Sequence, residues 1–143
     1  MEAQELRTGN YLRTTTQHRE GFVVGIIPKI DWLKDDVGII IHTKSDQNEE
    51  CDINYECNVL EPIPLTEEWL IKLGLKYITN NGSYAINIRD NDDDDDFGEL
   101  CLYDNLEVWL SLIDDSYRIN HIKFVHQLQN LYFALTGKEL EIK

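Results

Sequence analysis

The alternation of apolar and polar residues in DINYECNV, residues 52–59, is the feature that most constrains the fold of this chain. Ile53, Tyr55, Cys57 and Val59 fall on one face of an extended backbone, and polar residues fall on the other. Successive side chains of a β-strand point to opposite faces, so a period of two predicts a strand that is buried on one face only. A strand of this kind is stable only when other strands of the chain complete a sheet around it.

Three earlier segments provide such strands. Gly9–Thr15, Gly21–Ile27 and Val37–Thr43 are rich in β-branched and aromatic residues, and glycine, Pro28 and acidic residues separate them. Together with the alternating strand, they predict four short strands within about the first sixty residues. Residues 1–61 are therefore expected to form a small curled sheet or barrel of SH3-like size.

The next segment changes to a helical pattern with a signal at each end. Thr66 is a good N-cap for a helix, and acidic residues occupy the first turn, where the helix dipole favours them. Gly74 suits the left-handed position after the last turn. These signals predict a short helix over 67–73, which acts as a hinge between residues 1–61 and 62–143.

The remainder predicts a β-meander followed by a second helix. Apolar positions alternate in Tyr84–Ile88, Leu100–Leu102 and Leu106–Leu112, and turn residues such as Asn80-Asn81-Gly82 separate these segments. The segment YRINHIKF, residues 117–124, is a candidate further strand. In the last segment, Val125, Leu128, Leu131 or Tyr132, and Leu135 recur at helical spacing, and Gly137 ends the pattern.

The fold class that follows is α+β, dominated by antiparallel sheet. Residues 62–143 combine the short capped helix, the meander and an amphipathic C-terminal helix that covers the apolar face of the meander. The two parts, 1–61 and 62–143, either fold separately or share one core.

The charge of the chain is strongly acidic and unevenly distributed. The 143 residues carry a net charge of −14, and all of the excess lies after residue 45, where 21 acidic residues face seven basic ones. A surface of this kind repels phosphate, so direct binding to nucleic acid or to an anionic membrane is disfavoured. A basic protein partner is compatible with it. Oligomeric state is left open, because sheet edges are unassigned.

The location expected from the sequence is the cytoplasm. No apolar run approaches the roughly 20 residues that cross a bilayer, and the first residues do not have the pattern of a signal peptide. Cys51, Cys57 and Cys101 match no disulfide framework and are expected to be free thiols in a reducing compartment.

An unbroken acidic run lies in RDNDDDDDFGEL, residues 89–100. No alignment of the run with a calcium-binding EF-hand loop places ligands and glycine correctly. Blocks of like charge are usually solvated, so the favoured interpretation is the exposed tip of a hairpin. Mimicry of nucleic acid is the alternative, because clustered carboxylates can occupy a site that binds phosphates. The run consists of Asp92, Asp93, Asp94, Asp95 and Asp96.

No catalytic, cofactor-binding or metal-binding residue is assigned. The chain lacks a P-loop, a dinucleotide-binding glycine motif and a nucleophile elbow. His121 and His126 are five residues apart, whereas four would place two metal ligands on one helix face. Trp32, in the charged segment KIDWLKDD, is a candidate anchor for a partner, or it plugs the end of the barrel. The candidate partner-binding residues are therefore Trp32 and the acidic run.

Three sequence blocks resemble a group of small uncharacterised proteins encoded by phages and prophages. The blocks are ELRTGNYL, EPIPLTEEWLIKLGL and VHQLQNLYFALTGKEL, in the same order as in that group. The group has no assigned activity, so the resemblance implies a setting in the bacterial cytoplasm and no functional residues. We therefore expect a non-enzymatic phage-type accessory protein that acts by protein binding, with an acidic nucleic-acid mimic that inhibits a host DNA- or RNA-binding factor as the alternative.

Overall fold

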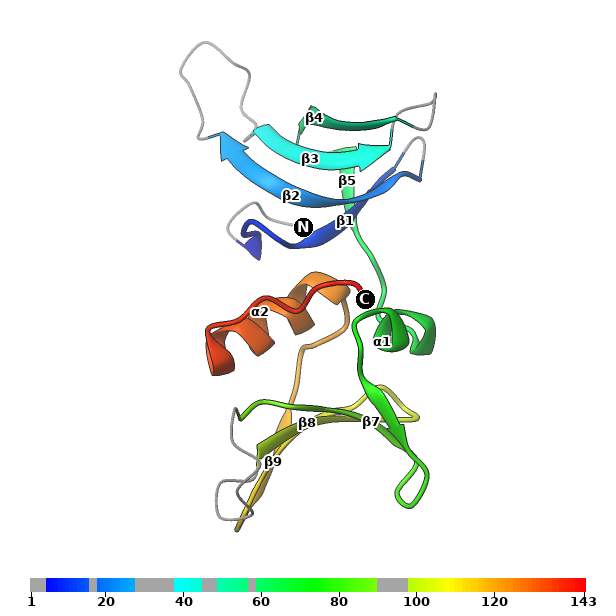
Figure 1. Ribbon diagram of the computed structural model, residues 1–143, viewed down its shortest axis with the longest axis vertical. Helices are drawn as coiled ribbons and strands as arrows, with labels where there is room; N and C mark the ends of the chain where they lie inside the picture. The colour runs from blue at the N-terminus through cyan, green and yellow to red at the C-terminus, as the bar shows by residue number, and fades with distance from the viewer. Residues whose placement is uncertain (1–4, 16–17, 28–37, 45–48, 57–58, 90–97) are drawn as a thin grey trace. The chain divides into compact units, whose positions relative to one another are not determined.

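The computed structural model describes residues 5–15, 18–27, 38–44, 49–56, 59–89 and 98–143. The chain divides into two compact units: the first comprises Met1–Ile63 with Phe124–His126, and the second comprises Pro64–Lys123 with Gln127–Lys143. Each unit contains one five-stranded antiparallel sheet, so the expected α+β class with mainly antiparallel sheet is confirmed (Figure 1). Neither of the described helices is long and apolar enough to cross a membrane.

The sheet of the first unit has the strand order β4-β3-β2-β1-β5. The strands are β1 (Tyr11–Thr14), β2 (Glu20–Ile27), β3 (Gly38–Lys44), β4 (Glu50–Glu56) and β5 (Leu60–Pro62). The four strands expected from the sequence are present. The short β5 was not predicted. Its last residue, Pro62, is tolerated because β5 is the last strand in the order.

The inner face of this sheet forms the apolar core of the first unit. Tyr55 packs against this core, as the alternation predicted for this residue, whereas β4 ends at Glu56 and does not reach Val59. Burying aliphatic side chains of this size contributes roughly 1.5–3 kcal/mol each to folding. The buried members are Leu6, Leu12, Val23, Ile39, Ile41 and Leu60.

A β-bulge interrupts the pairing of β2 with β3. Val23 pairs with Ile41, and the next pair is Gly25 with Ile40, so Val24 is the extra residue. Val24 is exposed. Because Val24 is unpaired, Val23 lies in the core opposite Ile41, and Gly25 pairs with Ile40 on the other side of the sheet.

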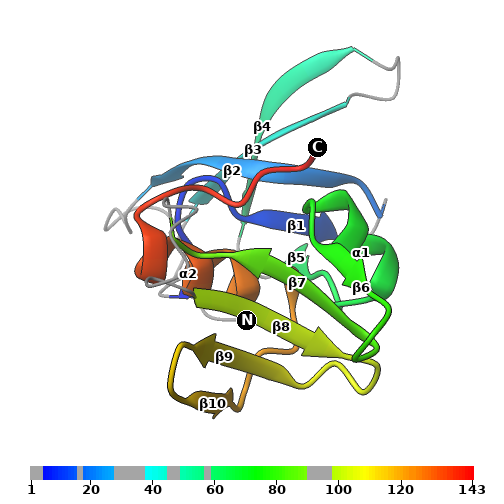
Figure 2. The ribbon, with the colours of Figure 1, turned by 60° about the horizontal axis from the view of Figure 1, so that its bottom comes forward.

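The second unit contains the predicted meander, which has five strands in the order β10-β9-β8-β7-β6 (Figure 2). Each strand pairs with its neighbour in sequence, so hairpin connections alone build the sheet. Its elements are α1 (Glu67–Lys72), β6 (Lys76–Ile78), β7 (Ser83–Asn87), β8 (Gly98–Tyr103), β9 (Val108–Leu112), β10 (Ser116–Ile119) and α2 (Val125–Thr136), whose first two residues belong to the first unit.

Helix α1 has the two ends that its sequence specifies. The Oγ1 of Thr66 accepts a hydrogen bond from the backbone N–H of Trp69 at 3.4 Å. At the other end, Gly74 has a φ of +81°, and the N–H of Leu75 donates to the carbonyl of Leu70. This last bond closes a Schellman-type end, as the glycine predicted.

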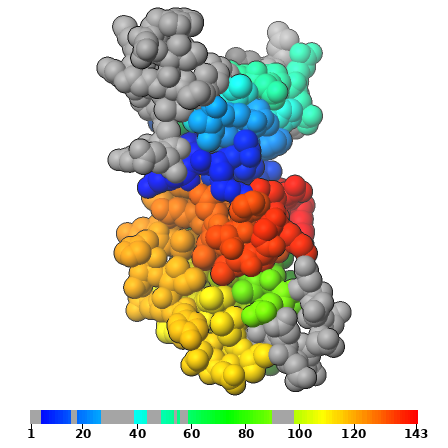
Figure 3. Space-filling view, turned by 90° about the vertical axis from the view of Figure 1, so that its left-hand side faces the viewer, coloured from blue at the N-terminus to red at the C-terminus, as the bar shows by residue number. Residues whose placement is uncertain are grey.

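Helix α2 is buried only over its first half, although most of its apolar residues lie in the second half. Leu128 is fully buried, whereas Phe133 and Leu135 are exposed, and the surface of the helix is visible in Figure 3. The sequence placed Leu135 on the covered face, and this is wrong for that residue. Gly137, with a φ of +71°, follows the helix as predicted. In Figure 1, α2 lies on one side of the meander.

Two predicted strands are shorter than expected, for the same physical reason. The strand expected over Leu106–Leu112 begins at Val108, because Leu106 has a φ of +58°. The strand expected over 117–124 ends at Ile119, because His121 has a φ of +85°. A left-handed backbone conformation cannot continue a β-strand.

Candidate functional site

The partner-binding residues predicted from the sequence lie outside the described residues. Trp32 falls between β2 and β3, and Asp92–Asp96 fall between β7 and β8. Strands β7 and β8 pair in antiparallel register as far as Asn87 and Glu99, so the acidic run belongs to the connection between two paired strands. Both predictions therefore stay as they were made.

The outer face of the first sheet carries a row of four chemically distinctive side chains. Tyr11 pairs with Phe22 across β1 and β2, Phe22 pairs with His42 across β2 and β3, and His42 pairs with Asp52 across β3 and β4. Residues that pair directly across a sheet point to the same face, so all four side chains share one surface. These residues are far apart in the sequence, and the register alone brings them together.

The rings of this row are in contact. The ring centroids of Tyr11 and Phe22 are 5.8 Å apart at an interplanar angle of 58°, and those of Phe22 and His42 are 5.0 Å apart at 37°. Tilted aromatic pairs at such distances contribute about 0.5–1.5 kcal/mol beyond the area that they bury. The contacts hold the rings in a fixed order across three strands.

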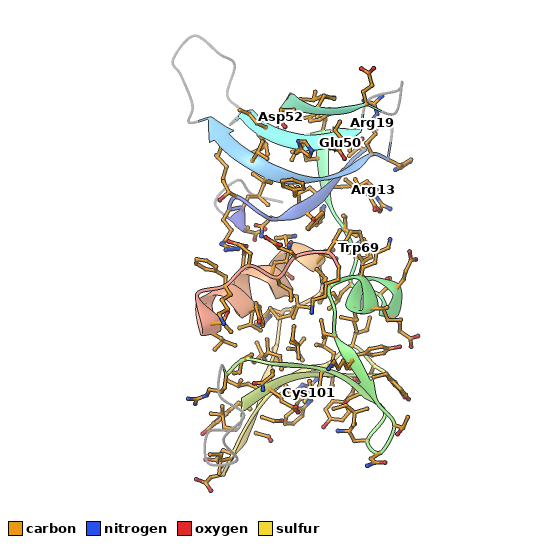
Figure 4. All side chains as sticks on the ribbon, in the orientation of Figure 1. Arg13, Arg19, Glu50, Asp52, Trp69 and Cys101 are labelled. Carbon is orange, nitrogen blue, oxygen red and sulfur yellow. The ribbon has the colours of Figure 1, made fainter. Side chains whose placement is uncertain are left out.

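Two carboxylates flank the imidazole at the end of the row. The Nδ1 of His42 lies 2.7 Å from Oδ1 of Asp52, and its Nε2 lies 3.9 Å from Oε2 of Glu50. The side chains of Asp52 and Glu50 are 58% and 72% exposed, so both carboxylates remain accessible to a partner. Figure 4 labels these two acids on the sheet of the first unit.

A second row lies beside the first on the same face. The Nε of Arg13 donates to Oε1 of Glu61 at 2.8 Å, which joins β1 to β5, and Arg13 pairs in register with Glu20 of β2. The charge of Arg13 is thus offset by its neighbour.

We use the name outer face for the surface formed by Tyr11, Phe22, His42, Glu50 and Asp52.

The outer face has the groups of a binding surface for cations. Aromatic ring faces attract ammonium and guanidinium groups, and carboxylates pair with them. Within the described ranges, no group of three or more His, Cys, Asp or Glu side chains is arranged to hold a metal ion.

The pairing of His42 with Asp52 resembles the part of a catalytic triad that orients the histidine. In such a triad, the second ring nitrogen faces a nucleophilic hydroxyl or thiol. Here Nε2 of His42 faces the carboxylate of Glu50 instead. Among the described residues, the arrangement holds an imidazole between two acids.

Of the two described thiols, Cys101 is the one whose surroundings oppose a role as a nucleophile. Cys101, on β8, is buried, and burial raises the pKa of its thiol, so the thiol stays protonated near neutral pH (Figure 4). Cys51, on β4, is half-buried and pairs in register with Thr43. Cys57 lies outside the described residues.

Sequence reasoning missed the outer face because it lacked the register. The available signal was the presence of Tyr11, Phe22 and His42 in three predicted strands, at positions that alternate with core residues. No family model, no curated protein and no solved structure matches the chain. Comparison with known proteins therefore does not identify the site.

Proposed function

We propose that this chain is a non-enzymatic accessory protein of phage or prophage type. It acts by binding a basic segment of a protein partner. The observation that carries the proposal is the outer face of the first sheet. There Tyr11, Phe22 and His42 form a continuous aromatic row that ends between Asp52 and Glu50.

Charge complementarity favours a basic partner. The chain has a net charge of −14, so it attracts cationic segments over distances of about a Debye length, ~10 Å at 0.1 M salt. Each cation seated on an aromatic ring contributes about 0.5–1 kcal/mol at an exposed site. A lysine or arginine side chain lying over Phe22 comes close to the carboxylates beside His42.

Two finer expectations form part of the proposal. The order β4-β3-β2-β1-β5, closed by the short β5 against β1, supports an SH3-like curled sheet. The resemblance of three sequence blocks to phage and prophage proteins supports a setting in the bacterial cytoplasm.

The experiment is a fluorescence anisotropy titration of a labelled hexa-arginine peptide, beside a hexaglutamate peptide and a glycine-serine peptide. Hexa-arginine binding is expected to weaken with salt. The double variant Glu50→Gln/Asp52→Asn is expected to bind roughly tenfold more weakly, and Phe22→Leu about threefold more weakly because the ring face is lost.

The matched control is Asp114→Asn/Asp115→Asn, which removes two exposed carboxylates from the second unit. This variant is expected to bind hexa-arginine like the unmodified chain. If it weakens binding as much as the outer-face variant does, the peptide responds to the total charge and the outer face is not the site. Circular dichroism verifies that each variant is folded.

A second candidate, the nucleic-acid mimic, is favoured by the distribution of charge. Residues 46–143 contain 21 acids and seven bases, and no lysine or arginine occurs from Asp90 through Ser116. This function predicts that the chain captures a host DNA- or RNA-binding protein. Added DNA or RNA is expected to displace the chain from that protein, and a variant with Asp92–Asp96 all changed to Asn is expected not to capture it. A captured protein that withstands both changes would exclude the mimic.

A further inference from the structure

A cavity of about 500 Å³ lies in the second unit, between the β8–β9 turn and the segment that follows β10. Its volume is within the range of small-molecule sites, roughly 300–1,000 Å³. Leu65 contributes one wall, and the other lining residues come from two stretches of chain, 105–108 and 118–123.

Five of the residues that line this cavity are apolar. Leu65 and Val108 are buried, and Leu106, Ile119 and Ile122 are partly buried beside them. Val108 and Ile119 pair across β9 and β10, so two of the apolar residues belong to the sheet itself. An apolar wall of this kind accommodates the hydrocarbon part of a small ligand.

The charged lining is basic, in contrast with the chain as a whole. The guanidinium of Arg118 forms an ion pair with Glu107, which offsets the acid. Lys123 adds a further positive charge, and the imidazole of His121 also lines the cavity. The formal charge of the lining is therefore positive, in a protein of net charge −14.

Two lining residues have a backbone conformation that is costly for their side chains. Leu106 has a φ of +58° and His121 a φ of +85°; of the described non-glycine residues, His18 is the one other with a positive φ. The left-handed conformation costs a non-glycine residue about 1–2 kcal/mol.

The β8–β9 turn explains how Leu106 is held. The N–H of Leu106 donates to the carbonyl of Tyr103 at 2.7 Å, and the N–H of Glu107 donates to Oδ1 of Asn105 at 3.0 Å. Hairpin turns of this type usually place glycine or asparagine at the left-handed position. Leucine at this position contributes an apolar side chain to the cavity, and costs of this size are commonly retained at functional sites.

We propose that this cavity binds a small amphipathic organic anion. The hydrocarbon part lies against Leu65, Leu106 and Val108, and the anionic head group lies toward Lys123 and Arg118. The head group is a carboxylate or a phosphate, which share the same recognition by cationic side chains. This site is separate from the outer face, so the two proposals can fail independently.

The experiment is nuclear magnetic resonance of the ¹⁵N-labelled full chain titrated with four probes of one shape. The probes are 2-naphthoate, 2-naphthyl phosphate, the neutral 2-naphthamide and the cationic 2-naphthylmethylammonium. We expect the two anions to shift the amide signals of 105–108 and 118–123, and the tighter of the two identifies the head group. The amide and the cation are expected to bind at least fivefold more weakly.

Two variants test the residues. Lys123→Gln is expected to weaken the binding of the anionic probe about three- to fivefold, whereas Lys76→Gln, an exposed lysine of β6 outside the cavity lining, leaves binding unchanged. Leu106→Gly removes an apolar wall and is expected to weaken binding roughly tenfold. Because glycine adopts a positive φ freely, this variant is expected to remain folded, which thermal unfolding verifies.

Three results would overturn the proposal: equal affinity of the neutral and anionic probes, signal shifts located outside the cavity lining, or normal affinity of a folded Leu106→Gly variant. None of these results bears on the hexa-arginine titration, which tests the outer face.

Discussion

His126 is the residue whose replacement gives the sharpest test of the packing described above. Its side chain is 1% exposed, and neither ring nitrogen has a hydrogen-bond partner among the described residues. Its ring stacks on Phe124, with centroids 5.9 Å apart at an interplanar angle of 10°. A neutral imidazole has one donor and one acceptor, and leaving a buried polar group unpaired costs about 1–3 kcal/mol.

The change His126→Leu removes both unpaired atoms and keeps an apolar side chain that suits a helix. We expect the free energy of unfolding to rise by about 1–3 kcal/mol at pH 8, despite the loss of the stacking contact with Phe124. The measurement is urea denaturation followed by tryptophan fluorescence.

The pH dependence supplies a second, independent readout. Burial lowers the pKa of His126, and the carboxylate of Glu5 opposes this shift to a smaller extent. Above the ordinary pKa of 6.5, the residue is neutral in both states and its protonation costs no stability. Below pH 6.5, His126 becomes protonated in the unfolded chain but stays neutral in the folded chain. The free energy of unfolding therefore falls by up to about 1.4 kcal/mol per pH unit.

His126→Leu lacks this loss, so its advantage over the unmodified chain is expected to grow between pH 7.5 and 5.5, by up to about 1.4 kcal/mol. The control is His18→Asn, which removes an exposed imidazole at a position with a φ of +50° that asparagine tolerates. It is expected to change stability by less than about 0.5 kcal/mol. A His126→Leu variant with no added stability and an unchanged pH slope would refute the reasoning.

Three further predictions concern stability and thiol reactivity. A Cβ on Gly21 would lie 2.4 Å from the carbonyl oxygen of His42, so Gly21→Ala is expected to destabilise the protein by about 2–3 kcal/mol; Gly25→Ala, whose nearest neighbour is a side-chain methyl at 3.3 Å, is expected to cost clearly less in the same urea assay. Thr66→Ala removes the N-cap of α1 and is expected to cost about 0.5–1 kcal/mol, against no measurable change for the exposed Thr79→Ala. In a Cys57→Ser background, Ellman's reagent is expected to modify the half-buried Cys51 in the native protein and the buried Cys101 only after unfolding; equal rates would contradict the burial of Cys101.

The elements of this fold that were predictable are those with local signals. Helix α1 was placed to within a residue, because Thr66 and Gly74 act on the backbone next to them. The strands were predictable because alternation reports which face is buried. The meander followed from turn residues that join neighbouring strands.

The parts that were not predictable depend on pairing between distant segments or on rare backbone conformations. Alternation assigns Tyr11, Phe22 and His42 to the solvent side of their strands, but nothing local to them says that they pair with one another. Leucine and histidine rarely adopt a positive φ, so Leu106 and His121 read as strand residues. Because of these two residues, β9 and β10 are shorter than predicted, and both residues line the cavity.

The bulge in β2 has a consequence for how this chain can change during evolution. Because Val24 stands outside the one-to-one pairing, a chain without it would still align Val23 with Ile41 and Gly25 with Ile40. Elsewhere in a paired strand, losing one residue moves every later side chain to the opposite face. Position 24 is therefore a place where single-residue deletions can arise and persist in a lineage, while the surfaces on both sides of the strand are inherited intact.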